Sequence, residues 1–281
     1  MFHSQNGTNR INLGDFKGAI VEFNKAIELD STMSQVYINR GIAYANLGQY
    51  NEAVLDFNKA LRIDPSLALA FYNLGVAKNY LGLKSEALKD YNKAIQLDQT
   101  YADAYLNRGV LNNDLGLYKN ALSDLNKALE LNPNSGIIYW NRGLSYGHLG
   151  LWDKSINDFN TAIQNNYIDS KVYYSRGVAK GASGDSKGAV EDFSVAIMKN
   201  PKDASSYVNR ATYNGNLGNI DQALVDLNKA IEIDPKFAMA YLNRGIIKIK
   251  MGNKTEACKD WTHAASLGDQ SAKEFIDKFC K

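Results

Sequence analysis

Residues 34–67, SQVYINRGIAYANLGQYNEAVLDFNKALRIDPSL, decide the architecture of this chain, because variants of the same stretch fill nearly all of its other positions. The variants follow one another at a constant period, the length of the quoted stretch, without an insertion or a deletion. A fixed period of this length indicates an array in which one supersecondary unit is repeated. Each unit of such an array packs only against its neighbours, so the length of the chain does not set a domain count in the usual way.

Each unit reads as two helices joined by a tight turn and followed by a short link. A glycine stands just after the first helix of every unit, where a left-handed backbone conformation closes a helix without a Cβ clash. These glycines are Gly14, Gly48, Gly82, Gly116, Gly150, Gly184, Gly218 and Gly252. All four prolines lie in the link after the second helix, where the missing N–H ends a helix. They are Pro65, Pro133, Pro201 and Pro235, and none interrupts a helix.

Small residues recur inside both helices of the unit. Gly41 lies in the middle of its first helix, and Ala53 and Ala60 lie on nearly the same face of the second. A glycine inside a helix costs about 1 kcal/mol relative to alanine. We therefore expect the second helix to approach closely at its first alanine position, while Tyr37, Phe57 and their counterparts fill the core.

The packing positions of a tetratricopeptide repeat are matched in the quoted unit by Tyr37, Gly41, Tyr44, Gly48, Ala53, Phe57, Ala60 and Pro65. The chain therefore resembles the tetratricopeptide repeat (TPR) family over nearly its whole length. The resemblance implies an all-α fold, a right-handed superhelix (solenoid) of eight helical hairpins, and a generic rather than a specific function. The repeats are expected at about 1–33, 34–67, 68–101, 102–135, 136–169, 170–203, 204–237 and 238–268. Residues 269–281 are expected to form a C-terminal helix that covers the last apolar face.

Charge and hydropathy exclude several classes of function. Lys and Arg number 32 against 30 Asp and Glu, a net charge of +2 that lacks the concentrated basicity of a nucleic-acid-binding protein. The chain contains no apolar run long enough to span a bilayer, so we expect no insertion into a membrane. The start MFHSQNGTNR does not read as a secretory signal. Because Met1 falls inside the first expected helix, the compartment stays open: cytoplasmic, or extracytoplasmic if an N-terminal signal has been removed.

Residues that could carry chemistry are few. His3, His148 and His263 form no HExxH pattern, and no glycine-rich phosphate loop is present. Cys258 and Cys280 are too few for a structural zinc site, and we favour two ordinary apolar residues over a disulfide unless the protein works in an oxidising compartment. We therefore expect no catalytic residue, no metal site and no cofactor.

Two rows of opposite charge recur at a constant spacing, the one that separates Arg40 from Asp56. The basic row comprises Arg40, Arg108, Arg142, Arg176, Arg210 and Arg244, and the acidic row comprises Asp56, Asp90, Asp124, Asp158, Asp192, Asp226 and Asp260. Charges so close to a helix crossing must be matched, so we predict salt bridges between the two helices of each repeat rather than an anion-binding ladder. The third repeat has Leu74 in place of Arg, and whether Arg108 serves its Asp90 stays open.

The functional signal is a row of asparagines on the first helices: Asn39, Asn73, Asn107, Asn141, Asn209 and Asn243. In the family that the chain resembles, this position faces the concave groove. A similar row of asparagines holds an extended peptide backbone in O-linked N-acetylglucosamine transferase. An amide offers both a donor and an acceptor to the peptide groups of a partner, whatever its side chains. The alternative is that asparagine is merely common and solvated at this position.

The residues preceding these asparagines would make the groove apolar, and we assign Ile38, Tyr72, Leu106, Trp140 and Tyr174 to partner binding with them. Tetratricopeptide domains that clamp chaperone tails carry Lys and Asn at two groove positions that are apolar here, which disfavours such a ligand. The fifth and sixth repeats depart most from the quoted unit, since Ser155 replaces a packing alanine and Ser175 breaks the asparagine row. We expect the packing to be loosest there.

These observations predict a non-catalytic scaffold that binds an extended peptide or protein segment in a concave groove, through the asparagine row and the apolar anchors. The alternative is a self-assembly module, a homo-oligomer whose groove accepts a helix of another copy.

Overall fold

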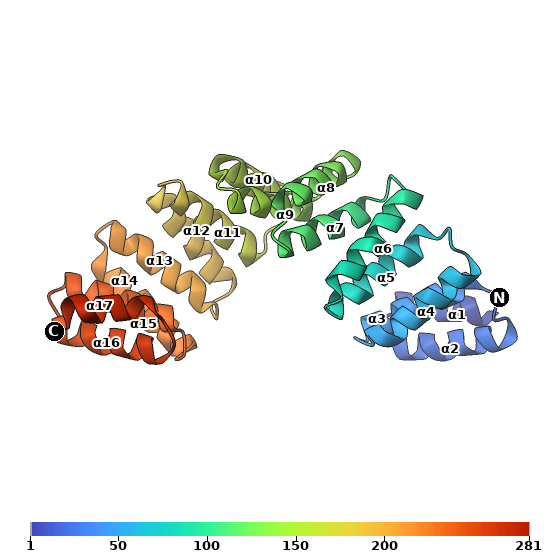
Figure 1. The fold of residues 1–281 in the computed structure, drawn as a ribbon, viewed down its shortest axis with the longest axis horizontal. Helices are drawn as coiled ribbons and strands as arrows, with labels where there is room; N and C mark the ends of the chain where they lie inside the picture. Colours follow the sequence, from blue (N-terminus) through green and yellow to red (C-terminus); the bar gives the residue numbers. More distant parts are fainter. Residues whose placement is uncertain (1, 281) are drawn as a thin grey trace. The chain divides into compact units, whose positions relative to one another are not determined.

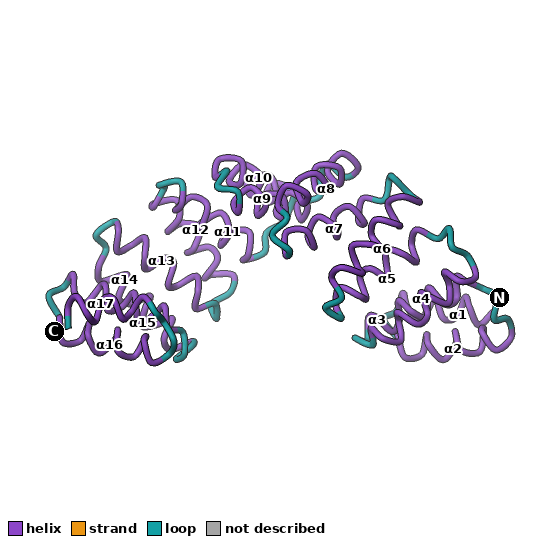
Figure 2. The backbone as a smooth tube through the Cα atoms, in the orientation of Figure 1, coloured by secondary structure: helices purple, strands orange, loops and turns teal. Residues whose placement is uncertain are grey.

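The computed structural model describes residues 2–280, and Met1, which the first expected repeat includes, lies outside them. The described residues form helices, turns and links without a β-strand (Figure 2). The helices are α1 (Phe2–Asn12), α2 (Phe16–Leu29), α3 (Ser34–Asn46), α4 (Tyr50–Ile63), α5 (Ala68–Tyr80), α6 (Lys84–Leu97), α7 (Ala102–Asp114), α8 (Tyr118–Leu131), α9 (Gly136–His148), α10 (Trp152–Gln164), α11 (Ser170–Ala182), α12 (Ser186–Lys199), α13 (Ala204–Asn216), α14 (Ile220–Ile233), α15 (Ala238–Lys250), α16 (Lys254–Ser266) and α17 (Ser271–Phe279). The predicted all-α fold class is confirmed.

The helices pair into hairpins, which Figure 1 shows along the chain, and each odd-numbered helix up to α15 packs on the even-numbered helix that follows it. The chain divides into two compact units, one up to Asn134 and one from Ser135. The first unit contains four hairpins, from α1 to α8. The second contains four hairpins, from α9 to α16, and the terminal helix α17. Within each unit, successive hairpins stack side by side as in a solenoid of repeats.

The turn inside each hairpin is a left-handed glycine, as predicted. Gly48 has φ of +75°, and the next amide, that of Gln49, donates a 2.9 Å hydrogen bond to the carbonyl oxygen of Tyr44. This bond satisfies a carbonyl that would otherwise lack a partner at the end of α3. All eight predicted glycines have φ between +72° and +98°. The turns are therefore alike along the chain.

The glycine in the middle of the first helix has a different partner from the one that we expected. A Cβ at Gly41 would lie 2.7 Å from Cε1 of Phe57, and a Cβ at Gly245 would lie 2.4 Å from Nε1 of Trp261. The glycine therefore makes room for the large side chain of the second helix, not primarily for Ala53 or its counterparts. The seventh repeat has Ala211 opposite Leu227, whereas the fourth keeps a glycine opposite a leucine, and a Cβ at Gly109 would lie 2.9 Å from Cγ of Leu125.

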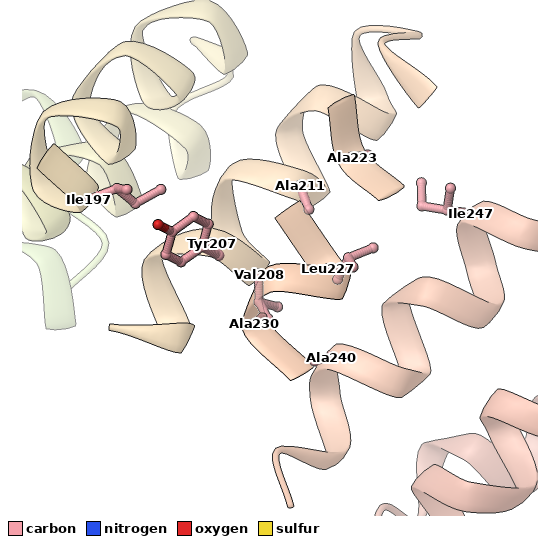
Figure 3. Packing of buried hydrophobic residues seen from close by; sticks show 9 residues of the cluster. All are labelled: Ile197, Tyr207, Val208, Ala211, Ala223, Leu227, Ala230, Ala240 and Ile247. Carbon is pink, nitrogen blue, oxygen red and sulfur yellow. The ribbon is translucent and has the colours of Figure 1, made fainter. Parts of the chain in front are cut away.

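The core is built from these second-helix side chains and from both alanine rows. The eight large second-helix residues are all at most 1% exposed: Phe23, Phe57, Tyr91, Leu125, Phe159, Phe193, Leu227 and Trp261. Figure 3 shows one such cluster, in which Leu227 and Ala223 of α14 lie between Ala211 of α13 and Ile247 of α15. This cluster thus joins the hairpin of α13 and α14 to α15, the first helix of the next hairpin.

The terminal helix α17 covers the last hairpin, and a disulfide bond fixes it there. Cys258 of α16 is bonded to Cys280, with 5.7 Å between their Cα atoms. The rings of Phe275 and Phe279 lie 5.1 and 5.6 Å from the fully buried ring of Trp261. Our preference for two unpaired cysteines was wrong, because the sequence does not show that the end of α17 turns back onto α16.

Two glycines of α9 provide a matched test of the packing. A Cβ at Gly143 would lie 2.7 Å from Cε1 of the buried Phe159, whereas a Cβ at Gly147 would come no closer than 3.3 Å, to Oγ of Ser155. We expect Gly143→Ala to lower the free energy of unfolding by about 1–3 kcal/mol through overpacking. Gly147→Ala should change it by less than about 1 kcal/mol, because the gain in helix propensity offsets the tight contact with Ser155. Urea denaturation followed by circular dichroism measures both, and equal effects of the two variants would contradict the assignment.

Removing the disulfide should destabilise the end of the second unit. Closing a loop of this length stabilises a fold by about 3 kcal/mol in the chain-entropy description. We expect Cys280→Ser, or addition of dithiothreitol, to lower the thermal midpoint and to raise amide exchange in α17 first. A Cys258→Ala/Cys280→Ala variant should no longer respond to dithiothreitol. An unchanged exchange rate in α17 on reduction would speak against a bond that holds this helix.

Candidate functional site

The arginine row is engaged within the protein. Arg40 donates from Nε and Nη2 to the two carboxylate oxygens of Asp56, at 2.8 and 2.7 Å. The same two-bond pairing recurs at Arg108, Arg142, Arg176, Arg210 and Arg244, each with the aspartate of its own repeat. The predicted salt bridges are confirmed in all six repeats. The carboxylates are buried, so their charge is matched inside the hairpin rather than presented to a ligand.

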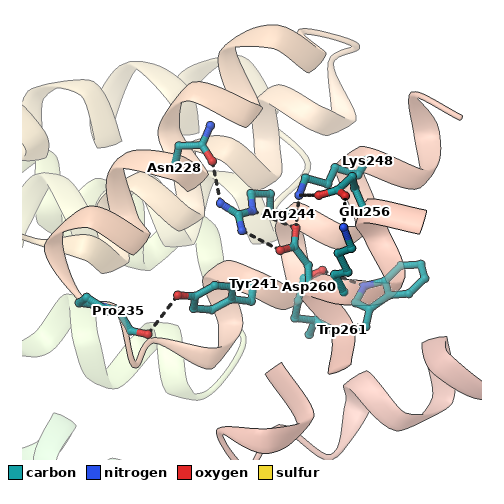
Figure 4. A network of polar contacts seen from close by, with 10 residues as sticks. Asn228, Pro235, Tyr241, Arg244, Lys248, Glu256, Asp260 and Trp261 are labelled. Atoms are coloured by element: carbon teal, nitrogen blue, oxygen red, sulfur yellow. Dashed lines mark hydrogen bonds and ion pairs between the residues drawn. The ribbon is translucent and has the colours of Figure 1, made fainter. Parts of the chain in front are cut away.

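These arginines make a third contact, which we did not predict from the sequence. Nη1 of Arg244 donates a 2.8 Å hydrogen bond to Oδ1 of Asn228, on the second helix of the preceding repeat (Figure 4). Arg40 and Arg108 make the same bond to Asn24 and Asn92, at 2.7 and 2.6 Å. Each of these guanidinium groups therefore joins three helices. The signal was available, because an asparagine precedes each of these arginines by the same spacing at which the aspartate follows it.

In the third repeat, a lysine takes the place of the arginine as the partner of the buried aspartate. Nζ of Lys78 lies 2.8 Å from Oδ2 of Asp90, an ion pair whose angles fall outside those of a hydrogen bond. Arg108 contacts Asp124 and Asn92 instead, which answers the question that the sequence left open. Burial raises the pKa of the Asp90 carboxyl above its ordinary value, and Lys78 opposes this shift only in part. The third repeat thus has a less well matched buried carboxylate.

The asparagine row lies on the first helices, with each amide at least partly buried. Every one of the six side chains donates from Nδ2 to an acceptor of the same protein. Asn73 and Asn141 bond the carbonyl oxygen one helical turn earlier in their own helices, both at 2.8 Å. Asn39 and Asn243 bond the hydroxyl oxygens of Thr8 and Thr212, in the preceding repeat. The amides are therefore oriented by the fold.

The remaining two asparagines bond a tyrosine of the preceding repeat. Nδ2 of Asn107 lies 2.9 Å from the hydroxyl oxygen of Tyr72, and Nδ2 of Asn209 lies 3.1 Å from that of Tyr174. Among residues 2–280, neither amide oxygen accepts a hydrogen bond, and neither tyrosine hydroxyl donates one. Burial raises the pKa of both phenols, so both keep their proton at neutral pH. Each pair thus holds one acceptor and one donor side by side.

The apolar residues assigned to partner binding differ in their exposure to solvent. Ile38 is fully buried, so its assignment was wrong: it lies in the core beside Tyr37 and Phe57. Tyr72, Leu106, Trp140 and Tyr174 are partly exposed. Trp140 packs on Tyr167, with 5.4 Å between ring centroids, and Tyr174 packs edge-on against Phe193. The partly exposed members remain candidates for contact with a partner.

Two cavities in the second unit adjoin Tyr174. One, of about 210 Å³, is formed by α9, α10 and α11 and includes Ser155 and Ser175 in its lining. The other, of about 440 Å³, is lined by Trp140 and by polar residues that include Lys171 and Asn200. Tyr174 and Ser175 belong to both. In the sequence, this region stands out only because Ser155 and Ser175 interrupt two rows there.

Within the described part of the chain, no group of three or more His, Cys, Asp or Glu side chains is arranged to hold a metal ion. No helix between Phe2 and Cys280 has both the length and the apolar character that crossing a membrane requires.

Comparison with known families gives consistent matches. One profile described as tetratricopeptide repeat matches residues 34–67 and 102–135, and a second with the same description matches 7–33. A profile described as TPR repeat matches 81–116 and 216–252. Together the matches cover more than half of the chain. A search of curated proteins returned no match.

Solved structures with a similar fold were also found. A tetratricopeptide repeat protein from Parabacteroides merdae is 24% identical, with a TM-score of 0.66, over 88% of this chain and 99% of its own. YrrB, described as a TPR protein with an unusual peptide-binding site, is 23% identical, with a TM-score of 0.57, over 67% of this chain and 97% of its own. The Cut9–Hcn1 hetero-tetramer of APC/C is 16% identical, with a TM-score of 0.69, over 98% of this chain and 55% of that one.

The two kinds of buried aspartate should respond differently to mutation. Asp226→Asn breaks the paired bonds to Arg210 and should lower the free energy of unfolding by about 2–3 kcal/mol. Asp90→Asn should cost less, because its carboxylate is less well matched.

The raised pKa of Asp90 also makes the effect of Asp90→Asn on stability depend on pH. A carboxyl group whose pKa is raised in the folded state stabilises the fold at pH values below its ordinary pKa of 3.8. This stabilisation is lost as the pH rises through the folded-state pKa. Urea denaturation between about pH 3 and pH 6 should show the wild-type chain losing stability relative to Asp90→Asn. A difference between the two proteins that is constant over this range would contradict the assignment.

Proposed function

Because the chain belongs to the tetratricopeptide repeat family, we propose that it is a non-catalytic scaffold that binds an extended peptide or protein segment along its first helices. Binding would use the asparagine row for the peptide backbone and the partly exposed apolar residues for side chains. The family match supports protein interaction in general, since members of one fold family differ in what they bind. The geometry of the asparagine row supports the finer proposal.

The observation that carries the proposal is the repeated asparagine–tyrosine pair. A peptide group has one N–H donor and one C=O acceptor, and it requires the complementary groups on its receptor. Asn107 with Tyr72 supplies both in the first unit, and Asn209 with Tyr174 supplies both in the second. The bond between the two side chains fixes their orientation before a ligand arrives, which lowers the entropic cost of binding.

The apolar members of the site add surface that does not depend on the peptide backbone. Trp140 and Tyr174 line one cavity of the second unit, together with Ser170 and Ser205. Aromatic side chains contribute most of the affinity of many interfaces. YrrB is described as carrying a peptide-binding site on a similar fold. This description and the cavity together favour a polypeptide ligand over a small polar molecule.

The proposal predicts that the pair in the second unit contributes to peptide affinity. Selection from a display library of random unstructured peptides against the wild-type chain supplies the probe. Tyr174→Phe/Asn209→Ala removes the donor and the acceptor, and should weaken the selected peptide by about 5- to 30-fold in a fluorescence titration. Tyr50→Phe/Asn51→Ala, the same two substitutions on the second helix α4, is the matched control and should bind like the wild type.

Two results would contradict the proposal. In the first, no peptide is enriched over a selection without protein. In the second, the Tyr174→Phe/Asn209→Ala variant keeps its fold by circular dichroism and binds the selected peptide with full affinity. Light scattering at several concentrations separates peptide binding from self-assembly, because a groove filled by a second copy would raise the mass with concentration.

A further inference from the structure

The cavity formed by α9, α10 and α11 is lined by residues that differ from those at the same positions of the other repeats. Alanine occupies one position of the second helix in every repeat except the fifth, where Ser155 replaces it. Asparagine occupies its first-helix position from the second repeat to the eighth, except in the sixth, where Ser175 replaces it. Both exceptions line this one cavity. The departures that looked like loosened packing therefore coincide with a space of about 210 Å³.

Space is left by Ser175, which is smaller than the asparagine it replaces, and also by Gly147. A Cβ at this position would be 3.3 Å from Oγ of Ser155 and 3.7 Å from Cζ3 of Trp152. The second repeat has Ala45 at this position, and the third has Asn79. At Gly215, by contrast, an added Cβ would lie 2.8 Å from the side chain of Ile247. The absence of a side chain at Gly147 thus leaves the cavity open on the side of α9.

The lining selects an apolar and uncharged occupant. Oγ of Ser155 donates a 2.7 Å hydrogen bond to the carbonyl oxygen of Gly143, so its hydroxyl proton is used within the protein. Trp152, Phe159 and Tyr174 supply aromatic surface, and none of the lining residues is Asp, Glu, Lys or Arg. An apolar protein cavity of about 150 Å³ is large enough to bind benzene. A cavity of 210 Å³ therefore has room for one aromatic ring, which would make ring contacts with its walls.

The polar cavity beside it suits the chain that would carry such a ring. It shares Tyr174 and Ser175 with the apolar cavity and is otherwise lined mainly by Ser170, Lys171, Asn200, Asp203 and Ser205. The carboxylate of Asp203 accepts hydrogen bonds from the amide and the hydroxyl of Ser206, so it is already engaged at the start of α13. Hydrogen-bonding side chains, among them the cationic Lys171, thus adjoin an apolar pocket.

We propose that the pocket between α9, α10 and α11 takes one aromatic side chain, of the size of phenylalanine, from the bound polypeptide. The proposal rests on the proposed function in one respect, that the side chain arrives on a peptide. It adds a side-chain preference to a site whose backbone contacts are independent of sequence. Ser175, which interrupts the asparagine row, then marks the position where the protein recognises a side chain of the ligand instead of its backbone.

The pocket can be tested without knowing the natural ligand. The probe is N-acetyl-L-phenylalaninamide, compared with N-acetyl-L-alaninamide, which presents the same backbone without the ring. Titration followed by ¹H–¹⁵N spectra should shift the amide signals of Ser175 and Val178, with the alanine probe binding at least about tenfold more weakly. Gly147→Leu, which places a side chain in the pocket, and Ser175→Asn, which restores the residue of the other repeats, should each abolish the shifts.

Asn79→Leu is the matched control, because Asn79 holds the position of Gly147 in the third repeat. It should leave the shifts unchanged. Thermal melts check that the variants fold. If Gly147→Leu does not fold, Ser175→Asn alone decides the test. The proposal is overturned if the phenylalanine probe shifts no signal of the pocket, or if both pocket variants bind it like the wild type.

The outcome is separable from that of the proposed function. If the phenylalanine probe enters the pocket but the display library yields no peptide, the pocket is upheld and the scaffold proposal fails. If selected peptides lack an aromatic residue and the probe does not bind, the scaffold proposal is upheld and the pocket fails.

Discussion

The contact between a glycine of the first helix and the large side chain of the second is the constraint on which the rest of the structure depends. Phe57 lies where a Cβ at Gly41 would clash, so the two helices of that hairpin approach as closely as a ring on a bare backbone allows. The fully buried ring then meets the first helix of the next hairpin. In the fourth repeat, where Leu125 replaces the ring, the facing residue is still a glycine, and a Cβ at Gly109 would lie 2.9 Å from Cγ of that leucine. The close approach of the two helices thus does not require an aromatic ring.

The arginine contacts extend this constraint from one hairpin to the next. A guanidinium bonded to an aspartate of its own hairpin and to an asparagine of the preceding one links the hairpins at a defined angle, as at Arg244. Buried ionic groups contribute little net stability, but a planar group with several fixed donors restricts geometry. We interpret the row as a device that makes successive hairpins stack in the same way. Regular stacking in turn places Tyr72 next to Asn107 and Tyr174 next to Asn209.

The sequence predicted those features that depend on local backbone rules or on a fixed spacing. Gly48 and its counterparts follow from helix termination, and the pairing of Arg40 with Asp56 follows from matched charges that recur together. The role of Gly41 was misjudged because periodicity shows which positions are small but not which row lies across from them. Ile38 was misplaced because residues adjacent on one helix can face a groove and a core. The pocket beside Ser155 could not be foreseen, since it depends on how Gly147, Ser155 and Ser175, from three different helices, come together.

The disulfide between Cys258 and Cys280 strengthens one end of the array. A stack held by nearest-neighbour contacts can lose its terminal repeat most easily, because that repeat has one interface instead of two. In this chain the last hairpin is closed by a covalent bond and by the rings of Phe275 and Phe279 on Trp261. The disulfide therefore keeps α17 from peeling away alone, and a pulling force applied beyond Cys280 is transmitted through the bond to α16.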